Sequence, residues 1–531
     1  MTLLRRAWLE LGNFAARDGR ATYLWPRWLV LRAIGIVYLL IFWGIHTEGR
    51  ALIGPDGLAP VERFCAHLRE VFPHPLERFI RAPSLFWVSS GPGMITLLTW
   101  TGLGAAAALV LNLWPRMALF ACWACFLSFV STWGLFSPTI IDQLMLETAL
   151  LAIVFAPAGL RPGLGASRPP SALAVFMMRW LLFRIMFGSG LIKAFAGDTH
   201  WRDFTALDVM YETSPAPTIL GFFDHQLPHA WHVGEIGLTF AAELLAPLLA
   251  VFGGARGRWV ALGLWVALQG GIQLTGNFGW LNTAAIALGL LLLDDQMLAA
   301  AARRLRASRL AAWFEGAPAA KVAPSRRWMH HGLTALLWLH FGLGLHAFVV
   351  EATGRTVIGK PDPRERPVDY LFRDFRLANA YVPFASFPAT KLEVEFAGSN
   401  DGGATWRPYL FHYKPQLEDR ISPFLAPRFA RFESSLQLAL YEQSPVLPGV
   451  ARQLLRRNPD VMGLFRDDPF EDRPATMIRI VVFEFKFTDL PTWRETGRFW
   501  TKGYVADFTQ PLSLDADGNL TGPPPPAPPA G

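Results

Sequence analysis

The chain has 531 residues, of which 52% are hydrophobic and 17% are charged. The hydrophobic residues occur in long blocks, which excludes an ordinary water-soluble protein of this size and indicates a polytopic membrane protein. The formal net charge is +7, but the arginines gather in the short segments between the apolar blocks. That distribution is typical of the orientation signal of a membrane protein, so we expect no nucleic acid as a partner.

The N-terminal segment, residues 1–27, carries several arginines ahead of the first apolar block. It is too long and too mixed in composition to be the n-region of a signal peptide. No small-residue cleavage site follows the first block, which ends near His46. We therefore expect that block to stay in the membrane as an anchor.

Nine apolar segments follow one another along the chain. Each is long enough, or nearly so, for the roughly 20 residues that a spanning helix needs. We predict about nine transmembrane helices, of which the eighth is short. The segments are Trp28–Ile45, Gly93–Leu113, Met117–Phe136, Ile140–Ala156, Leu173–Phe195, Val233–Phe252, Trp259–Leu274, Leu281–Leu293 and Leu333–Val350.

The basic short loops fix the orientation of these segments. With the N-terminus in the cytoplasm, every short loop rich in arginine falls on the cytoplasmic side, as the positive-inside rule requires. The chain then divides into a cytoplasmic N-terminal segment, a membrane domain with two exported loops, an exported C-terminal domain and a Pro-rich tail. The expected ranges are 1–27, 28–352 (with loops 46–92 and 196–232), 353–514 and 515–531.

The predicted C-terminal domain has the composition of a soluble protein. Residues 391–396 (KLEVEF) and 481–487 (VVFEFKF) alternate apolar and charged side chains, which predicts half-buried strands with Glu393 and Glu395 in water. Residues 428–442 place apolar side chains on one helical face. We predict a β-rich α+β domain, followed by a disordered tail because GPPPPAPPAG offers little to bury.

Four charged residues lie inside predicted spans: Asp142 and Glu147 in the fourth, and Arg179 and Arg184 in the fifth. A charged side chain at the centre of a bilayer costs at least about 2.5 kcal/mol unless it is paired. Glu147 and Arg184 should lie at similar depth, so we expect an ion pair, made directly or through Asp142. A structural lock between two helices is one interpretation of such a pair, and a functional site is the other.

Lys193 ends the fifth segment on the exported side. It either extends to the interface or acts as a base or as a holder of an acidic group. His225, His229 and His232 have helical spacing, but Pro228 interrupts them, and we predict no metal site. The pair Cys122 and Cys125 lies in an apolar segment, where we expect packing and not redox chemistry. No phosphate-binding loop or serine elbow is present, so we predict no cofactor.

Several motifs are more specific. They are GSGLIKAFAGDTHWRDFTALDVMYETSPAP at 188–217, HQLP at 225–228, AELLAPLL at 242–249, GNFGWLNTAAIALGLLLLDD at 276–295 and DDPFEDRPATMIRIVVFEFKFT at 467–488. Their order and spacing resemble those of the lipase maturation factor family through nearly the whole chain. The chain departs from the family pattern at 427–431, where PRFAR lacks the expected acid and aromatic residue.

The resemblance implies a multi-pass membrane protein that helps exported lipases, or other secreted enzymes, to mature. Its relatives would reside in the endoplasmic reticulum membrane, and a bacterial member in the cytoplasmic membrane with its C-terminal domain in the periplasm. The partners implied are the lipid bilayer and an exported client protein, with the oligomeric state open. The motif residues implied to bind the partner are Gly190, Lys193, Gly197, Asp198, Trp201, Arg202, Asp203, Tyr211, Glu212, Pro215, Pro217, His225 and Pro228.

A weaker resemblance reaches the membrane domain of the vitamin K-dependent carboxylase and its relatives. It rests on Gly190, Leu191, Lys193, Asp198 and Trp201, and it implies Lys193 as a catalytic base. Two functions therefore stay open. We favour a folding factor whose aromatic loop residues, such as Trp201 and Phe222, form an apolar surface for a client, and the alternative is a membrane enzyme.

Overall fold

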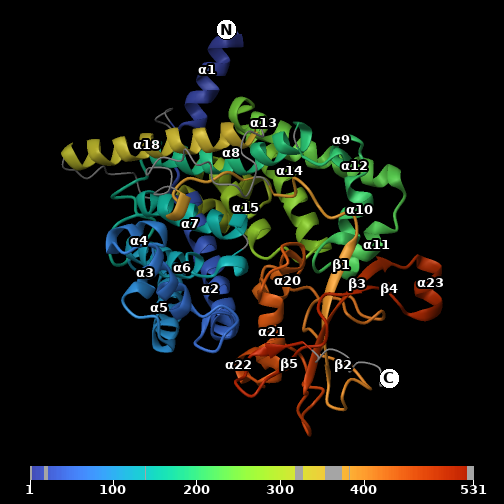
Figure 1. Ribbon diagram of the computed structural model, residues 1–531. Coiled ribbons are helices and arrows are strands. Elements are labelled where there is room, and N and C mark those ends of the chain that lie inside the picture. Colours follow the sequence, from blue (N-terminus) through green and yellow to red (C-terminus); the bar gives the residue numbers. More distant parts are fainter. Residues whose placement is uncertain are drawn as a thin grey trace, which may run out of the picture.

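The computed structural model describes residues 3–16, 22–137, 139–195, 197–316, 327–352, 373–381 and 383–522. Helices make up the part before residue 353, and a sheet with short helices makes up the part after residue 372. Figure 1 shows the N-terminal helix at one end of the molecule and the C-terminal domain at the other.

The first half of the helical part runs from the N-terminal helix to the helix that carries Arg179 and Arg184. Its helices are α1 (Leu3–Phe14), α2 (Leu24–Ile53), α3 (Val61–Val71), α4 (Pro75–Arg81), η1 (Leu85–Trp87), α5 (Pro92–Val110), α6 (Pro115–Val130), η2 (Gly134–Phe136), α7 (Thr139–Phe155) and α8 (Ala172–Phe195).

The second half begins with four short helices in and after the loop that follows α8. Its helices are α9 (Thr199–Arg202), α10 (Ala206–Thr213), α11 (Ile219–His225), α12 (His229–Phe240), the π-turn η3 (Ala241–Leu245), α13 (Ala246–Phe252), α14 (Gly254–Thr275), α15 (Leu281–Gly289), η4 (Leu290–Leu292), α16 (Asp295–Arg304), α17 (Ser308–Glu315) and α18 (Arg327–Ala352).

Five helical spans in the described residues are long and apolar enough to cross a membrane. They are Leu24–Ile53, Pro92–Val110, Ala172–Phe195, His229–Phe252 and His331–Val350. A sixth is possible if Leu281–Leu292 and Asp295–Arg304, which meet at 97°, count as one broken span or re-entrant pair. The protein is therefore a helical membrane protein with five or six apolar spans by length and composition.

Of the about nine spanning helices expected, five or six meet this criterion of length and composition among the described residues. Each of the nine predicted segments does contain helix, but α6 and α7 have 16 and 17 residues, and α14, with 22 residues, is long enough but is not among the apolar spans. At 1.5 Å per residue, α6 and α7 fall short of the roughly 30 Å hydrocarbon core. The sequence pattern reports apolar helices, and it does not separate spanning helices from shorter ones buried among their neighbours.

The C-terminal domain is built on a four-stranded antiparallel sheet. Its strands are β1 (Lys391–Ser399), β2 (Arg407–Pro408), β3 (Met477–Phe487) and β4 (Trp500–Asp507), in the order β2-β1-β3-β4. The two predicted strands are thus neighbours, and Val394 lies opposite Val482. The short helices of the domain are α20 (Arg431–Tyr441), α21 (Val446–Leu455), α22 (Pro459–Met462) and α23 (Leu490–Thr496).

Strand β1 differs from the predicted half-buried strand, because its glutamates are inside. Glu393 and Glu395 are 2% and 5% exposed. Glu393 pairs with Lys391 at 2.8 Å and also with Lys414, and Glu395 pairs with Lys502. Burial alone would raise the pKa of Glu393, but the two lysines bring it below its ordinary value. Alternation predicted the strand, but both of its faces are interior, where Lys391 of the same strand and Lys414 and Lys502 from other segments pair with the two glutamates.

The ordered chain continues past the predicted end of the domain at residue 514. Strands β5 (Ser513–Leu514) and β6 (Leu520–Thr521) form a hairpin in which Ser513 pairs with Thr521. The first part of the expected tail therefore has structure, and residues 523–531 lie outside the described residues.

Candidate functional site

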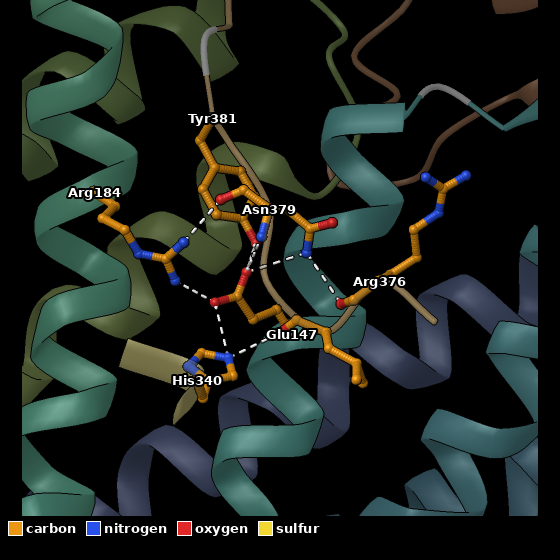
Figure 2. Close-up of polar contacts among 7 residues, drawn as sticks. Glu147, Arg184, His340, Arg376, Asn379 and Tyr381 are labelled. Atoms are coloured by element: carbon orange, nitrogen blue, oxygen red, sulfur yellow. Dashed lines mark hydrogen bonds and ion pairs between the residues drawn. The ribbon is translucent and has the colours of Figure 1, made fainter. Parts of the chain in front are cut away.

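A cluster of polar side chains surrounds Glu147 inside the helical part (Figure 2). Glu147 on α7 is fully buried and pairs with Arg184 on α8. Its carboxylate also lies 3.3 Å from His340 Nε2 on α18. The structure thus brings the two predicted partners together and adds a third helix to them.

The same carboxylate holds the segment that leads into the C-terminal domain. Asn379 donates its backbone N–H at 3.0 Å and its side-chain amide at 3.1 Å, and the Tyr381 hydroxyl donates at 2.8 Å. Arg184 donates in turn to the carbonyl oxygen of Asn379 at 2.8 Å. Glu147 is therefore saturated with donors, which is how a buried carboxylate is kept in a low-dielectric interior.

The other two predicted intramembrane charges have different partners from those expected. Asp142 accepts both arms of Arg431, from helix α20 of the C-terminal domain, at 2.9 and 2.8 Å. Among the described residues Arg179 has no carboxylate partner, and it donates to the carbonyl oxygens of Leu291 at 2.7 Å and Phe14 at 2.8 Å. These carbonyl groups of α1 and η4 accept from Nε and one terminal nitrogen of its guanidinium, so Arg179 links the N-terminal helix to α8.

Arg431 links the C-terminal domain to the helical part. Its guanidinium is 4.3 Å from the centroid of the Trp133 ring and 5.3 Å from that of Trp280, and it donates to the carbonyl oxygen of Phe136 at 3.1 Å. Aromatic faces and a carboxylate together suit a desolvated arginine. Arg431 is the last residue of the PRFAR departure, which therefore supplies a buried anchor.

Lys193 pairs with an acid on the next long span. Its Nζ lies 2.7 and 2.9 Å from the two carboxylate oxygens of Glu243, which sits in the π-turn η3. Gly190, one turn earlier, makes the approach possible, because a Cβ there would lie 2.7 Å from Leu244 and 2.9 Å from Glu243. Both charged side chains are buried, so Lys193 does not extend to the interface.

The residues after Lys193 fold into a turn against the segment before β1. Gly197 has no room for a side chain, because a Cβ would lie 2.7 Å from the carbonyl oxygen of Ala385. Asp198 caps α9 through the N–H of His200, and Trp201 donates from Nε1 to the carbonyl oxygen of Phe384 at 2.9 Å. Arg202 and Asp203 are exposed, and Arg202 donates to the carbonyl oxygen of Gly197.

The next part of the motif contacts the sheet. We call these contacts, made by residues 212–217 together with Phe222 and Asn277, the socket. Glu212 accepts the backbone N–H of Phe487 at 2.7 Å, and the carbonyl oxygens of Ser214 and Pro215 accept Lys391 at 2.5 and 3.4 Å. Pro217 pairs with Gly276 in an isolated bridge.

Asn277 and Phe222 complete this socket. Asn277 bonds both to Ala216 and, through three bonds, to Pro423, Leu425 and Ala426. Phe222 contacts the rings of Phe487, Trp493 and Phe499.

These contacts show how exposed the residues of the expected client surface are. Trp201 and Phe222 are 2% and 0% exposed, and Pro217 is buried. Trp201, Pro217 and Phe222 are therefore buried in contacts of the fold and do not lie on a free apolar surface. Exposed aromatic side chains do occur nearby, at Phe204 and Trp231.

The three spaced histidines have separate surroundings. His229 Nδ1 lies 2.8 Å from Asp208, and His232 Nδ1 lies 3.1 Å from Glu235. His225 packs on Phe487, and burial lowers its pKa. Pro228 is exposed and directly precedes α12. Tyr211 donates to Glu235 at 3.0 Å, beside a cavity of about 90 Å³ that Lys193 and Glu243 also line.

The site as a whole is a set of buried charges and a socket that fix a β-sheet domain onto membrane helices. This geometry defines a polytopic membrane protein with a clamped C-terminal sheet domain. The chain belongs to the lipase maturation factor family: residues 25–300 match the model of the lipase maturation factor transmembrane domain, and residues 377–510 match that of the C-terminal domain.

Individual relatives align over nearly the whole chain. Mouse lipase maturation factor 1 is 27% identical over 94% of this chain and 89% of its own length. Human lipase maturation factor 1 is 26% identical over 93% and 89%, and human lipase maturation factor 2 is 26% identical over 92% and 83%. No solved structure matches the chain.

Several site residues escaped the sequence analysis. His340, Asn379, Tyr381 and Arg431 reach Glu147 or Asp142 from positions between 193 and 289 residues away in sequence, and no local pattern marks such partners. Glu243 had a signal, because it is an acid within a predicted span and therefore needs a partner.

Proposed function

We propose that this protein is a membrane-anchored maturation factor for exported lipases. Membership of the family supports the proposal, since its relatives are named for that role. We further propose that the N-terminus faces the cytoplasm and that the C-terminal domain is exported, into the periplasm if the host is bacterial. Two contacts support this orientation, because they join loop 46–92 to the C-terminal domain: Asn458 donates to the carbonyl oxygen of Asp56 at 2.7 Å, and Arg50 pairs with Asp460.

The observation that carries the proposal is the exposed edge of a rigidly held sheet. Strand β4 ends the sheet among the described residues, and Gly503–Asp507 is exposed along its length. Tyr504 and Val505 are 63% and 49% exposed. An edge strand with an exposed backbone and exposed apolar side chains can add an extended segment of an incompletely folded chain. The socket and Arg431 keep that edge at a fixed distance from the membrane.

The test is co-expression with an exported lipase from the same genome in a strain that lacks this protein. We expect the wild-type chain to restore active secreted lipase and the variant Tyr504→Lys/Val505→Lys to restore less. The matched control is Leu438→Lys/Tyr441→Lys, which changes two exposed apolar residues of α20 that are 44% and 49% exposed. Equal lipase activity with and without the wild-type chain would contradict the proposed function. Equal loss in both variants would contradict the role of β4.

The alternative function, a membrane enzyme with Lys193 as base, has one observation in its favour, which is that Lys193 lines a cavity. Lys193→Arg separates the two proposals. A positioning role tolerates a retained positive charge beside Glu243, whereas a base that must lose its proton does not. Lipase maturation that survives Lys193→Arg would rule out the enzyme.

A further inference from the structure

The cavity beside Lys193 lies where α8, α12 and α14 end near the C-terminal domain. Its wall is largely apolar and includes Leu207, Leu238, Leu268 and Ile272. The volume of about 90 Å³ is several times the ~10–15 Å³ that one water needs, and it is too small for a whole lipid. It suits the polar head of an amphiphile whose chain continues outside.

Two hydrogen-bond donors in the wall have capacity left. Lys193 Nζ carries three N–H groups and gives two of them to Glu243, with the Trp201 ring 5.2 Å away. The Ser214 hydroxyl has no hydrogen-bond partner among the described residues, although Ser214 is only 7% exposed and lines the cavity. An unpartnered buried hydroxyl costs free energy that a ligand carbonyl would recover.

The charged side chains that line the cavity determine which type of ligand head group it can hold. One cation, Lys193, faces three carboxyl groups, those of Asp224, Glu235 and Glu243. Glu243 already neutralises Lys193, so a carboxylate or phosphate head would meet a surplus of negative charge. A neutral head with ester carbonyls to accept and a hydroxyl to donate matches both the donors and the acids.

We infer that this cavity binds the head of a neutral acylglycerol, such as a diacylglycerol, from the adjoining leaflet. The ligand enters the cavity beside Gly271. This glycine is exposed, it lines the cavity, and a Cβ there would meet nothing within 4 Å. The inference rests on the geometry of the cavity and does not depend on the proposed function.

The experiment uses the full-length protein in phosphatidylcholine nanodiscs with a trace of diacylglycerol that carries a photoactivatable diazirine. We expect saturable labelling of the peptide that spans residues 265–278, competed by unlabelled dioleoylglycerol. Gly271→Phe fills the entrance and should reduce the labelling at least ~5-fold. Ser214→Ala removes one neutral hydrogen bond and should weaken competition roughly 3–10-fold.

The matched control is Gly270→Phe, because Gly270 also has open space around its Cβ but does not line the cavity. Its labelling should equal that of the wild type, and thermal unfolding checks that all three variants fold. Labelling that does not saturate, or that is equal in Gly271→Phe and Gly270→Phe, would show bilayer contact only and overturn the inference. Stronger labelling by a photoactivatable fatty acid would overturn the neutral head group.

Discussion

At the scale of single residues, the protein buries charged side chains at positions where apolar side chains could pack. Glu147 and Asp142 each accept an arginine and further donors, and Lys193 meets Glu243 on another span. Such pairs stabilise little relative to apolar packing, but breaking one leaves an isolated buried charge. They therefore specify which helices meet, and two of them also determine where the C-terminal domain attaches.

Glu147→Ala should destabilise the protein by about 3–5 kcal/mol, because Arg184 would stay charged without a carboxylate. Thermal unfolding in detergent measures the change. The double variant Glu147→Ala/Arg184→Met should recover part of the loss, while Asn379 and Tyr381 still lack their acceptor. A single variant as stable as the wild type would show that Arg184 has another partner.

Glu433 should make stability depend on pH. Its carboxylate accepts backbone N–H groups from His412, Tyr413 and Lys414, yet burial raises its pKa from 4.5 to about 7. The folded state thus binds this proton more tightly than the unfolded state does. The resulting stabilisation is complete below pH 4.5 and is lost as the pH rises through about 7. In Glu433→Gln the melting temperature should lose the part of its pH dependence that comes from this carboxyl group. A pH profile equal to that of the wild type would contradict the role of Glu433.

At the scale of elements, close approach depends on small residues at particular places. Helix α8 reaches the π-turn η3 only because Gly190 has no side chain. Gly190→Val should push the two apart and cost about 1–3 kcal/mol. The control is Gly237→Val on α12, where a Cβ would meet nothing within 4 Å. Equal melting temperatures for the two variants would mean that the helices can separate freely.

The attachment of α20 gives a second prediction at this scale. Arg431→Ala removes the partner of Asp142 and empties the aromatic box around Trp133 and Trp280. We expect the C-terminal domain to loosen, so that limited proteolysis releases it at lower protease concentration. Arg466→Ala, which removes an exposed pair with Asp467, should leave the cleavage pattern unchanged. Protection of Arg431→Ala equal to that of Arg466→Ala would contradict an anchoring role.

Local patterns predicted elements better than they predicted partners. The period of two in KLEVEF identified β1, and apolar runs identified helices, because both depend on nearest neighbours. Nine apolar runs correspond to only five or six spans by length and composition, since an apolar helix such as α6 has 16 residues. Glu393 was expected in water because its lysine partner Lys414 lies in another segment. The same limit hid Arg431 as the partner of Asp142.

At the scale of the whole molecule, the membrane helices and the loop 196–232 hold the C-terminal sheet in place. They fix the sheet through Glu212, Asn277 and Arg431, and β4 lies at one edge of that sheet (Figure 1). The motif residues that resemble those of other family members thus position the domain. We propose that a client contacts the exposed edge strand β4.

Site-specific photo-crosslinking from that edge tests the account most directly. A photoreactive amino acid at Val505, in the full-length protein co-expressed with an exported lipase, should yield a covalent lipase adduct. The adduct should be lost once the lipase has folded. The same amino acid at Leu438, exposed on α20, should yield little. Lipase adducts at Leu438 but none at Val505, or none at either position, would contradict the account.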